Sequence, residues 1–129
     1  MPAPSRTLYW IGWVLCVLPA PLLVFSALGK FMMPKAVIDG FEHLGWPTRT
    51  ALPLGIIELA CLILFLIPQT AVLGAILLTG YLGGAIATHV RIGEAWYIPA
   101  ALGVVFWLGL FLRDPRLRVL LPLRTITRP

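Results

Sequence analysis

Residues 52–67, LPLGIIELACLILFLI, decide the class of fold, because Glu58 is the one charged side chain in the stretch. Similar apolar runs cover residues 8–28, 71–89 and 97–112. A helix that crosses a bilayer needs about 20 residues, so the two shorter runs must borrow flanking residues. Backbone groups in lipid must bond within their own segment, and the alternation typical of membrane barrels is absent from these runs. The sequence therefore predicts an all-α integral membrane four-helix bundle.

The composition excludes soluble and disordered classes of protein. Only 12% of the 129 residues are Asp, Glu, Lys or Arg, about half the share of a typical soluble domain. With 60% hydrophobic residues and a mean hydropathy of +0.95, the chain is too apolar to stay disordered. The formal net charge of +5 comes from scattered basic residues without a recognition motif, so no nucleic acid partner is expected. We predict a single membrane domain, residues 1–129, in contact with the lipid bilayer.

The first apolar run contains two helix-breaking residues. Pro19 and Pro21 are expected to kink its helix or to end it early. The length of the run and the lack of a small-residue cleavage site favour a retained span over a cleaved signal peptide.

A short amphipathic helix is predicted between the first two spans, at residues 34–44. Pro34 suits the first position of a helix, and Gly45 suits the residue just past its end. The apolar side chains at helical spacing are Val37, Phe41 and Leu44. Such a helix would lie at the outer membrane interface, over the mouth of the bundle, and a half-helix that re-enters between the spans is the alternative.

The basic residues predict the orientation in the membrane. An even number of spans puts both termini on one side, where the basic tail, residues 113–129, would meet anionic headgroups. Six basic residues lie at the two ends of the chain: Arg6, Arg113, Arg116, Arg118, Arg124 and Arg128. Four lie on the opposite side: Lys30, Lys35, Arg49 and Arg91. Because positive residues favour the cytoplasm, both termini are predicted to be cytoplasmic.

The third span contains a GxxxG pattern. Gly80 and Gly84 are four residues apart, and small residues at this spacing let helices approach closely in lipid. We expect them to pack within the bundle. A contact between two copies of the chain is the alternative.

Ionisable residues gather at one depth of the predicted bundle. Glu58 lies inside the second span, while Lys30, His43, His89 and Arg91 lie at the outer ends of other segments. A buried carboxyl and an imidazole could exchange protons with a bound ligand, so Glu58 and His89 are the candidate catalytic pair. The candidate ligand-binding residues are Lys30, His43 and Arg91. In the simpler reading, Glu58 only pairs with Lys30 or Arg91 to join helices, and both histidines are interfacial or solvated.

Other cofactor chemistry has weaker support in the sequence. No tight His/Glu spacing such as HExxH occurs, so no metal site is predicted. Quinone is a candidate ligand, and two histidines leave non-covalent haem open. Cys16 and Cys61 share a depth but form no CxxC, which favours two buried apolar side chains over a redox couple.

The ordered set of short motifs resembles the DoxX-like family of small four-helix bacterial membrane proteins. The resemblance covers almost the whole chain. Its motifs are LGKF at 28–31, HLGWP at 43–47, GIIEL at 55–59, YLGGA at 81–85 leading to His89, and RDPRL at 113–117.

The resemblance implies a function linked to membrane redox chemistry. Family members are linked to membrane-associated oxidoreductase systems, including thiosulfate:quinone oxidoreductase subunits and thiol-stress complexes. Lys30, Glu58 and His89 match recurring family positions, which carry no agreed catalytic roles. We therefore expect a bacterial inner-membrane subunit of a quinone- or thiol-linked system. Its lipophilic ligand would lie at the outer end of the bundle. Its partner would be an oxidoreductase subunit or a second copy of the chain. The alternatives are a stand-alone isomerase or hydrolase that uses the Glu/His pair, and a non-catalytic assembly partner.

Overall fold

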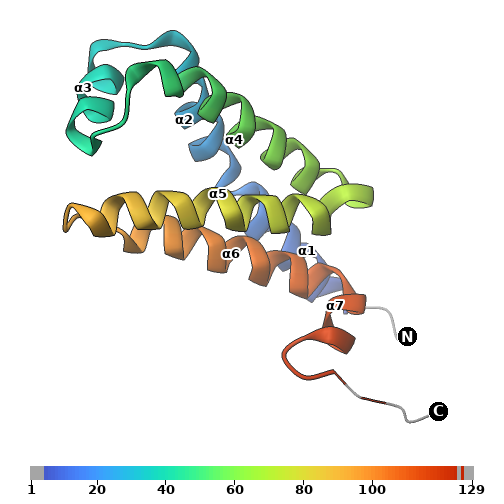
Figure 1. Cartoon of the computed structure of the whole chain (residues 1–129). Helices are drawn as coiled ribbons and strands as arrows, with labels where there is room; N and C mark the ends of the chain where they lie inside the picture. The colour runs from blue at the N-terminus through green and yellow to red at the C-terminus, as the bar shows by residue number, and fades with distance from the viewer. Residues whose placement is uncertain (1–4, 125, 127–129) are drawn as a thin grey trace.

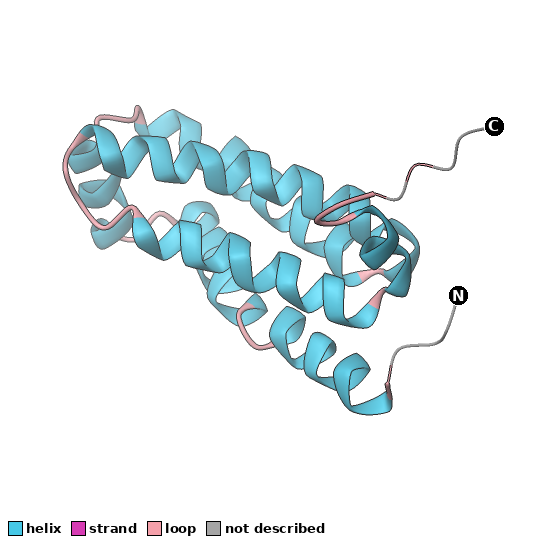
Figure 2. Ribbon diagram, turned by 90° about the horizontal axis from the view of Figure 1, so that it is seen from below, coloured by secondary structure: helices cyan, strands magenta, loops and turns pink. Residues whose placement is uncertain are grey.

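The computed structural model describes residues 5–124 and residue 126, and this part of the chain contains helices but no strand (Figure 2). The prediction of an all-α chain is confirmed. The outer residues of the predicted basic tail, including Arg128, lie outside the described residues. The helices are α1 (Arg6–Val17), α2 (Ala20–Met32), α3 (Lys35–Leu44), η1 (Thr48–Thr50), α4 (Ala51–Leu66), η2 (Pro68–Thr70), α5 (Ala71–Arg91), α6 (Tyr97–Arg113) and α7 (Pro115–Leu120).

The first apolar run forms two helices, because its prolines interrupt the backbone ladder. α1 ends at Val17, and α2 begins at Ala20 with Pro19 as its cap and Pro21 in its first turn. Proline has no N–H to donate to a carbonyl one turn earlier, so the chain changes direction there. As a result α1 packs against α6, whereas α2 packs against α4.

The remaining long helices form a splayed arrangement. α4 and α5 meet at η2 and diverge towards α3, while α6 runs back along α5 (Figure 1). The core lies at the end where they meet, around Phe65 and Phe106, whose rings are 5.0 Å apart in an edge-to-face contact. The start of α1 and the short α7 lie at this same end (Figure 1).

Length and hydropathy allow three helical stretches to cross a membrane, namely Arg6–Met32, Thr48–Leu66 and Pro68–Arg91. The helix Tyr97–Arg113 is apolar but shorter. Many large apolar side chains point outward, among them Phe25 and Leu18, which are 77% and 74% exposed. An apolar exterior of this extent is typical of a surface that faces lipid.

The predicted helix between the first two spans is present as α3. Pro34 caps the helix instead of occupying its first turn, and Gly45 follows it with φ of +78°. The amide N–H groups of Gly45 and Trp46 donate to the carbonyls of Glu42 and Phe41. This ending needs a left-handed residue, which glycine adopts without strain.

The expectation that Gly80 and Gly84 pack within the bundle is wrong. A Cβ atom at either position would meet no atom of the described chain within 4 Å. The close approaches use other glycines. A Cβ at Gly74 would lie 2.2 Å from the Phe65 nitrogen, and one at Gly12 would lie 2.6 Å from the Gly109 carbonyl oxygen. The GxxxG spacing gives no information on which face of α5 meets α4.

We predict opposite effects for two Gly→Ala substitutions on α5. Gly74→Ala should destabilise the protein by about 1–3 kcal/mol or more, because the methyl group overlaps the α4 backbone. Gly80→Ala should stabilise by about 0.5–1 kcal/mol through helix propensity alone. The midpoints of thermal unfolding in detergent measure both effects. Equal midpoints for the two variants would contradict this packing.

Candidate functional site

A cavity of about 970 Å³ lies where the helices diverge, between α2, α4, α5 and α6, with α3 at one end. It exists because α2 follows α4 while α6 follows α5, so the two pairs separate beyond their junction at η2. Apolar side chains form most of the lining. The polar side chains that line it are Ser26, Lys30, Glu58, Tyr81, Thr88, His89 and Glu94.

A buried ion pair forms the most polar part of the cavity wall. Glu58 is 2% exposed, and its Oε2 accepts a hydrogen bond from Lys30 Nζ at 2.9 Å. Ser26, one turn before Lys30 on α2, also donates to Glu58 Oε2, at 3.2 Å. Lys30 Nζ donates to Ser26 Oγ at 2.7 Å, which closes a three-membered network. These contacts are those of a carboxylate with an ammonium group.

Gly55 explains how α2 comes close enough to α4 for this network. A Cβ at Gly55 would lie 3.0 Å from Lys30 Cβ and 2.9 Å from the Phe31 ring. Gly55 and Glu58 are three residues apart, so they lie on neighbouring parts of one face of α4. The missing side chain at Gly55 therefore lets Lys30 reach Glu58.

His89 lines the same cavity but belongs to a different wall. It lies near the end of α5, and its Nδ1 donates to the Ala85 carbonyl at 2.7 Å. A carbonyl can only accept, so the proton of this bond belongs to Nδ1. Nε2 is then the ring nitrogen that can accept from a ligand when the imidazole is neutral.

His43 and Arg91 do not line the cavity and do not contact Glu58. His43 Nε2 lies 2.5 Å from Glu94 Oε1, with both side chains about half exposed. Arg91 donates to the Leu44 carbonyl at the end of α3. Of the five residues that were predicted to lie together, only Lys30 and Glu58 are in contact, and His89 lines the same cavity.

Four polar residues that line the cavity were not among the predicted site residues, namely Ser26, Tyr81, Thr88 and Glu94. Ser26 completes the ion-pair network, Tyr81 lines the cavity, and Glu94 is the partner of His43. The signal for Ser26 was available, because it lies four residues before Lys30 and so on the same face of a helix. Nothing in the sequence predicts the pairing of Glu94 with a residue 51 positions away.

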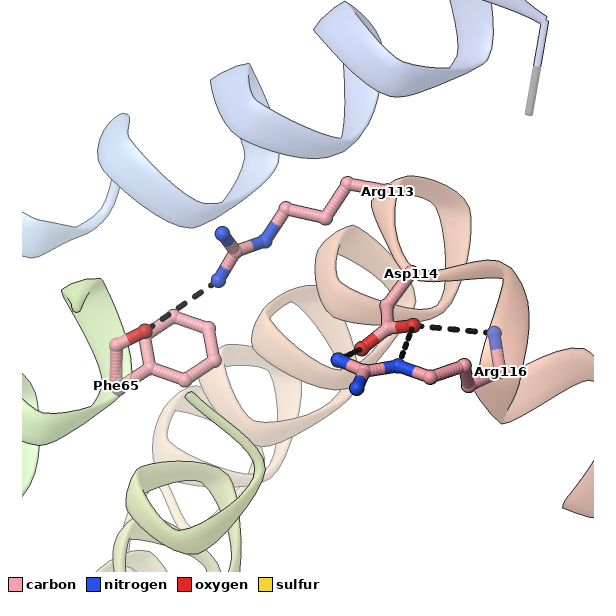
Figure 3. Close-up of polar contacts among 4 residues, drawn as sticks. All are labelled: Phe65, Arg113, Asp114 and Arg116. Carbon is pink, nitrogen blue, oxygen red and sulfur yellow. Dashed lines mark hydrogen bonds and ion pairs between the residues drawn. The ribbon is translucent and has the colours of Figure 1, made fainter. Parts of the chain in front are cut away.

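A second buried charge lies at the opposite end of the bundle. Arg113 is 7% exposed, and its guanidinium stacks 3.9 Å from the centre of the Trp13 ring. Its Nη2 donates to the Phe65 carbonyl at the end of α4, at 3.3 Å (Figure 3). A cation at the C-terminal end of a helix is stabilised by the helix dipole. Arg113 therefore joins α1, α4 and α6, whereas it was predicted to lie at the start of a basic tail that meets anionic headgroups.

The hydrogen bonds of Asp114 go to the next basic residue, Arg116, and not to Arg113. Asp114 accepts two hydrogen bonds of 3.0 Å from the Arg116 guanidinium and one of 3.0 Å from the Arg116 backbone (Figure 3). The Arg116 guanidinium holds the pKa of the Asp114 carboxyl below its ordinary value of 3.8. The contact caps the start of α7.

The two cysteines and the metal chemistry give no further site in the described residues. Cys16 and Cys61 are both buried and free, and a Cβ at Gly109 would lie 2.7 Å from Cys16 Sγ. Thus Cys16 packs into the crossing of α1 and α6. No group of three or more His, Cys, Asp or Glu residues is close enough to hold a metal ion within the part of the chain that the structure describes.

Removing one member of the buried pair should cost more than removing both. Lys30→Met leaves the Glu58 carboxylate buried without its cation, which should destabilise the protein by about 3–5 kcal/mol. The double variant Lys30→Met/Glu58→Leu should recover much of this loss, because no uncompensated charge remains. Thermal unfolding in one detergent compares four proteins: wild type, Lys30→Met, Glu58→Leu and the double variant. A double variant as unstable as the sum of its single variants would contradict a direct pair.

Comparison with known proteins places the chain in a family. No curated protein and no solved structure gives a match. The model of the DoxX-like family matches residues 14–110, about three quarters of the chain, a segment that holds the ion pair and every residue that lines the cavity. The chain therefore belongs to the DoxX-like family.

Proposed function

We propose that the chain binds the ring of a quinone-like lipophilic molecule in its cavity, as the membrane component of a redox system. The observation that supports this most is the Lys30–Glu58 pair, a buried charge network on the wall of an otherwise apolar cavity. Ligand sites of this kind combine a mainly apolar lining with a few convergent polar groups. The links of the DoxX-like family to quinone and thiol oxidoreductases point in the same direction.

The membrane placement is part of this proposal. The bent α1–α2 segment, α4, α5 and α6 would form four spans of a bacterial inner-membrane bundle, with α3 at the outer interface. Three of these stretches have the required length and hydropathy. α6 is shorter, and it would span with the help of flanking residues or by thinning the bilayer locally. The excess of basic residues near the two chain ends would place both termini in the cytoplasm.

The polar groups divide the chemistry between two walls of the cavity. On one wall, the Lys30 ammonium can donate to a quinone oxygen while the Glu58 carboxylate can accept the proton of a quinol hydroxyl. On the other wall, His89 Nε2 can accept the second hydroxyl proton. Interconversion of quinone and quinol moves two protons and two electrons. Glu58 and His89 would carry the protons, and an associated oxidoreductase subunit would supply or accept the electrons.

Quinone binding to the purified protein tests this function. The probe is decylubiquinone, and the readout is quenching of tryptophan fluorescence in lipid nanodiscs, because Trp46 lines the cavity. Glu58→Gln and His89→Gln should each weaken binding by about tenfold, the effect of losing one hydrogen bond to a charged or well-placed group. Glu42→Gln, an exposed change on α3, serves as the control.

The thermal midpoint of each variant is measured beside its affinity, so that a folding defect is not read as a binding defect. Wild-type affinity in folded Glu58→Gln and His89→Gln would overturn the assignment of these residues. Failure of the wild-type protein to bind any quinone would overturn the proposed function and favour an assembly role. Turnover of an apolar substrate by the isolated protein would favour the isomerase or hydrolase alternative.

A further inference from the structure

Several residues of α4 and α5 that line the cavity are also exposed at the surface of the protein. Gly80 and Gly84 line the cavity, both are exposed, and a side chain at either would meet no described atom within 4 Å. Ile57 on α4 and Leu77 on α5 also line the cavity while being 50% and 42% exposed. These residues border a lateral slot, defined here by Ile57, Leu77, Gly80 and Gly84. The slot has an apolar border, and Glu58 lines the same cavity.

The end of the cavity beneath α3 is covered instead. Phe41, Leu44 and Trp46 line the cavity from this side. Trp46 Nε1 donates to Thr88 Oγ1 at 3.3 Å, which links the chain after α3 to α5.

Two further contacts hold the same cover. His43 pairs with Glu94, and Arg91 donates to the Leu44 carbonyl, so α3 is attached to the end of α5 and to the turn that follows it. A ligand that entered from the aqueous side would have to break these contacts. A ligand that entered from the side would break none of them.

We infer that the cavity is filled from the bilayer through the lateral slot, by a molecule with a polar ring and a long apolar chain. The ring would lie against Lys30 and Glu58, and the chain would pass out over Gly80 and Gly84. This inference rests on the proposed function and adds the route and the shape of the ligand. Gly80 and Gly84 pack against no helix of the described residues, so the space beside them would provide room for the chain.

The physical role of the slot is steric. A hydrocarbon chain gains little by moving from lipid tails to an apolar slot, because the two environments are similarly apolar. The slot would therefore add little affinity, but closing it would leave a chain attached to a bound ring without an exit. A ring without a chain needs no exit, so the two ligands should respond differently to a blocked slot.

The test compares two quinones that share one ring. The probes are 2,3-dimethoxy-5-methyl-1,4-benzoquinone, which lacks a chain, and decylubiquinone, which carries a decyl chain on that ring. Gly84→Leu places a side chain in the slot. Gly83→Leu is the matched control. Gly83 lies on the same helix, is also exposed, and a Cβ there would meet no described atom within 4 Å, but it does not line the cavity. Both variants are measured in lipid nanodiscs, with their oligomeric state determined by light scattering.

Gly84→Leu should weaken binding of decylubiquinone by about tenfold or more and leave the chainless ring within about threefold of wild type. Gly83→Leu should change neither affinity. Unchanged binding of decylubiquinone to Gly84→Leu would overturn the lateral route, as would equal losses for both quinones. A change of oligomeric state in Gly84→Leu alone would indicate that the lateral slot contacts a second copy of the chain. This result would also overturn the inference. If the wild-type protein binds neither quinone, this result overturns the proposed function itself, on which the lateral route rests.

Discussion

The Lys30–Glu58 contact is the interaction on which the arrangement of the helices depends. A carboxylate that is 2% exposed in an apolar bundle needs its cation close by, because desolvation of an unpaired charge costs several kcal/mol, on the order of the whole stability of a small protein. The 2.9 Å contact fixes α2 beside α4 and requires the bend at Pro19. Since α1 remains on α6, the bend separates α2 from α6 and opens the cavity between the two helix pairs.

Different kinds of contact hold the helices together at the two ends of the molecule. At the closed end, Gly12, Gly74 and Gly109 let backbones touch, and Arg113 joins three helices by stacking on Trp13 and capping α4. This end has few polar groups to offer a ligand, since Asp114 is occupied by Arg116. At the other end the helices stand apart, and α3 bridges them through polar contacts. Rigid packing at one end therefore supports a cavity lined by charged groups at the other.

The sequence predicted the helices well, because runs of apolar residues and prolines act locally. Residues 34–44 and the interruption near Pro19 were predicted for the same reason, and α7 was missed because its six residues carry no periodic pattern. Position along the predicted spans places five residues at a similar depth: Lys30, Glu58, His43, His89 and Arg91. It does not predict the direction in which each side chain points. The Lys30–Glu58 pair was one of two pairings that depth allowed. Which glycines pack depends on helix crossings, which no local pattern encodes.

The protonation state of Glu58 in the folded protein tests the central claim most directly. Infrared spectra of wild type and Glu58→Gln, recorded in lipid at neutral pH, differ by the bands of this one carboxyl group. The account predicts a difference band at the position of an ionised carboxylate, and it predicts that Lys30→Met shifts this band, because the carboxyl group loses its ammonium partner. A protonated Glu58 in the wild-type protein, or a carboxylate band that is unchanged in Lys30→Met, would contradict an ion pair between α2 and α4.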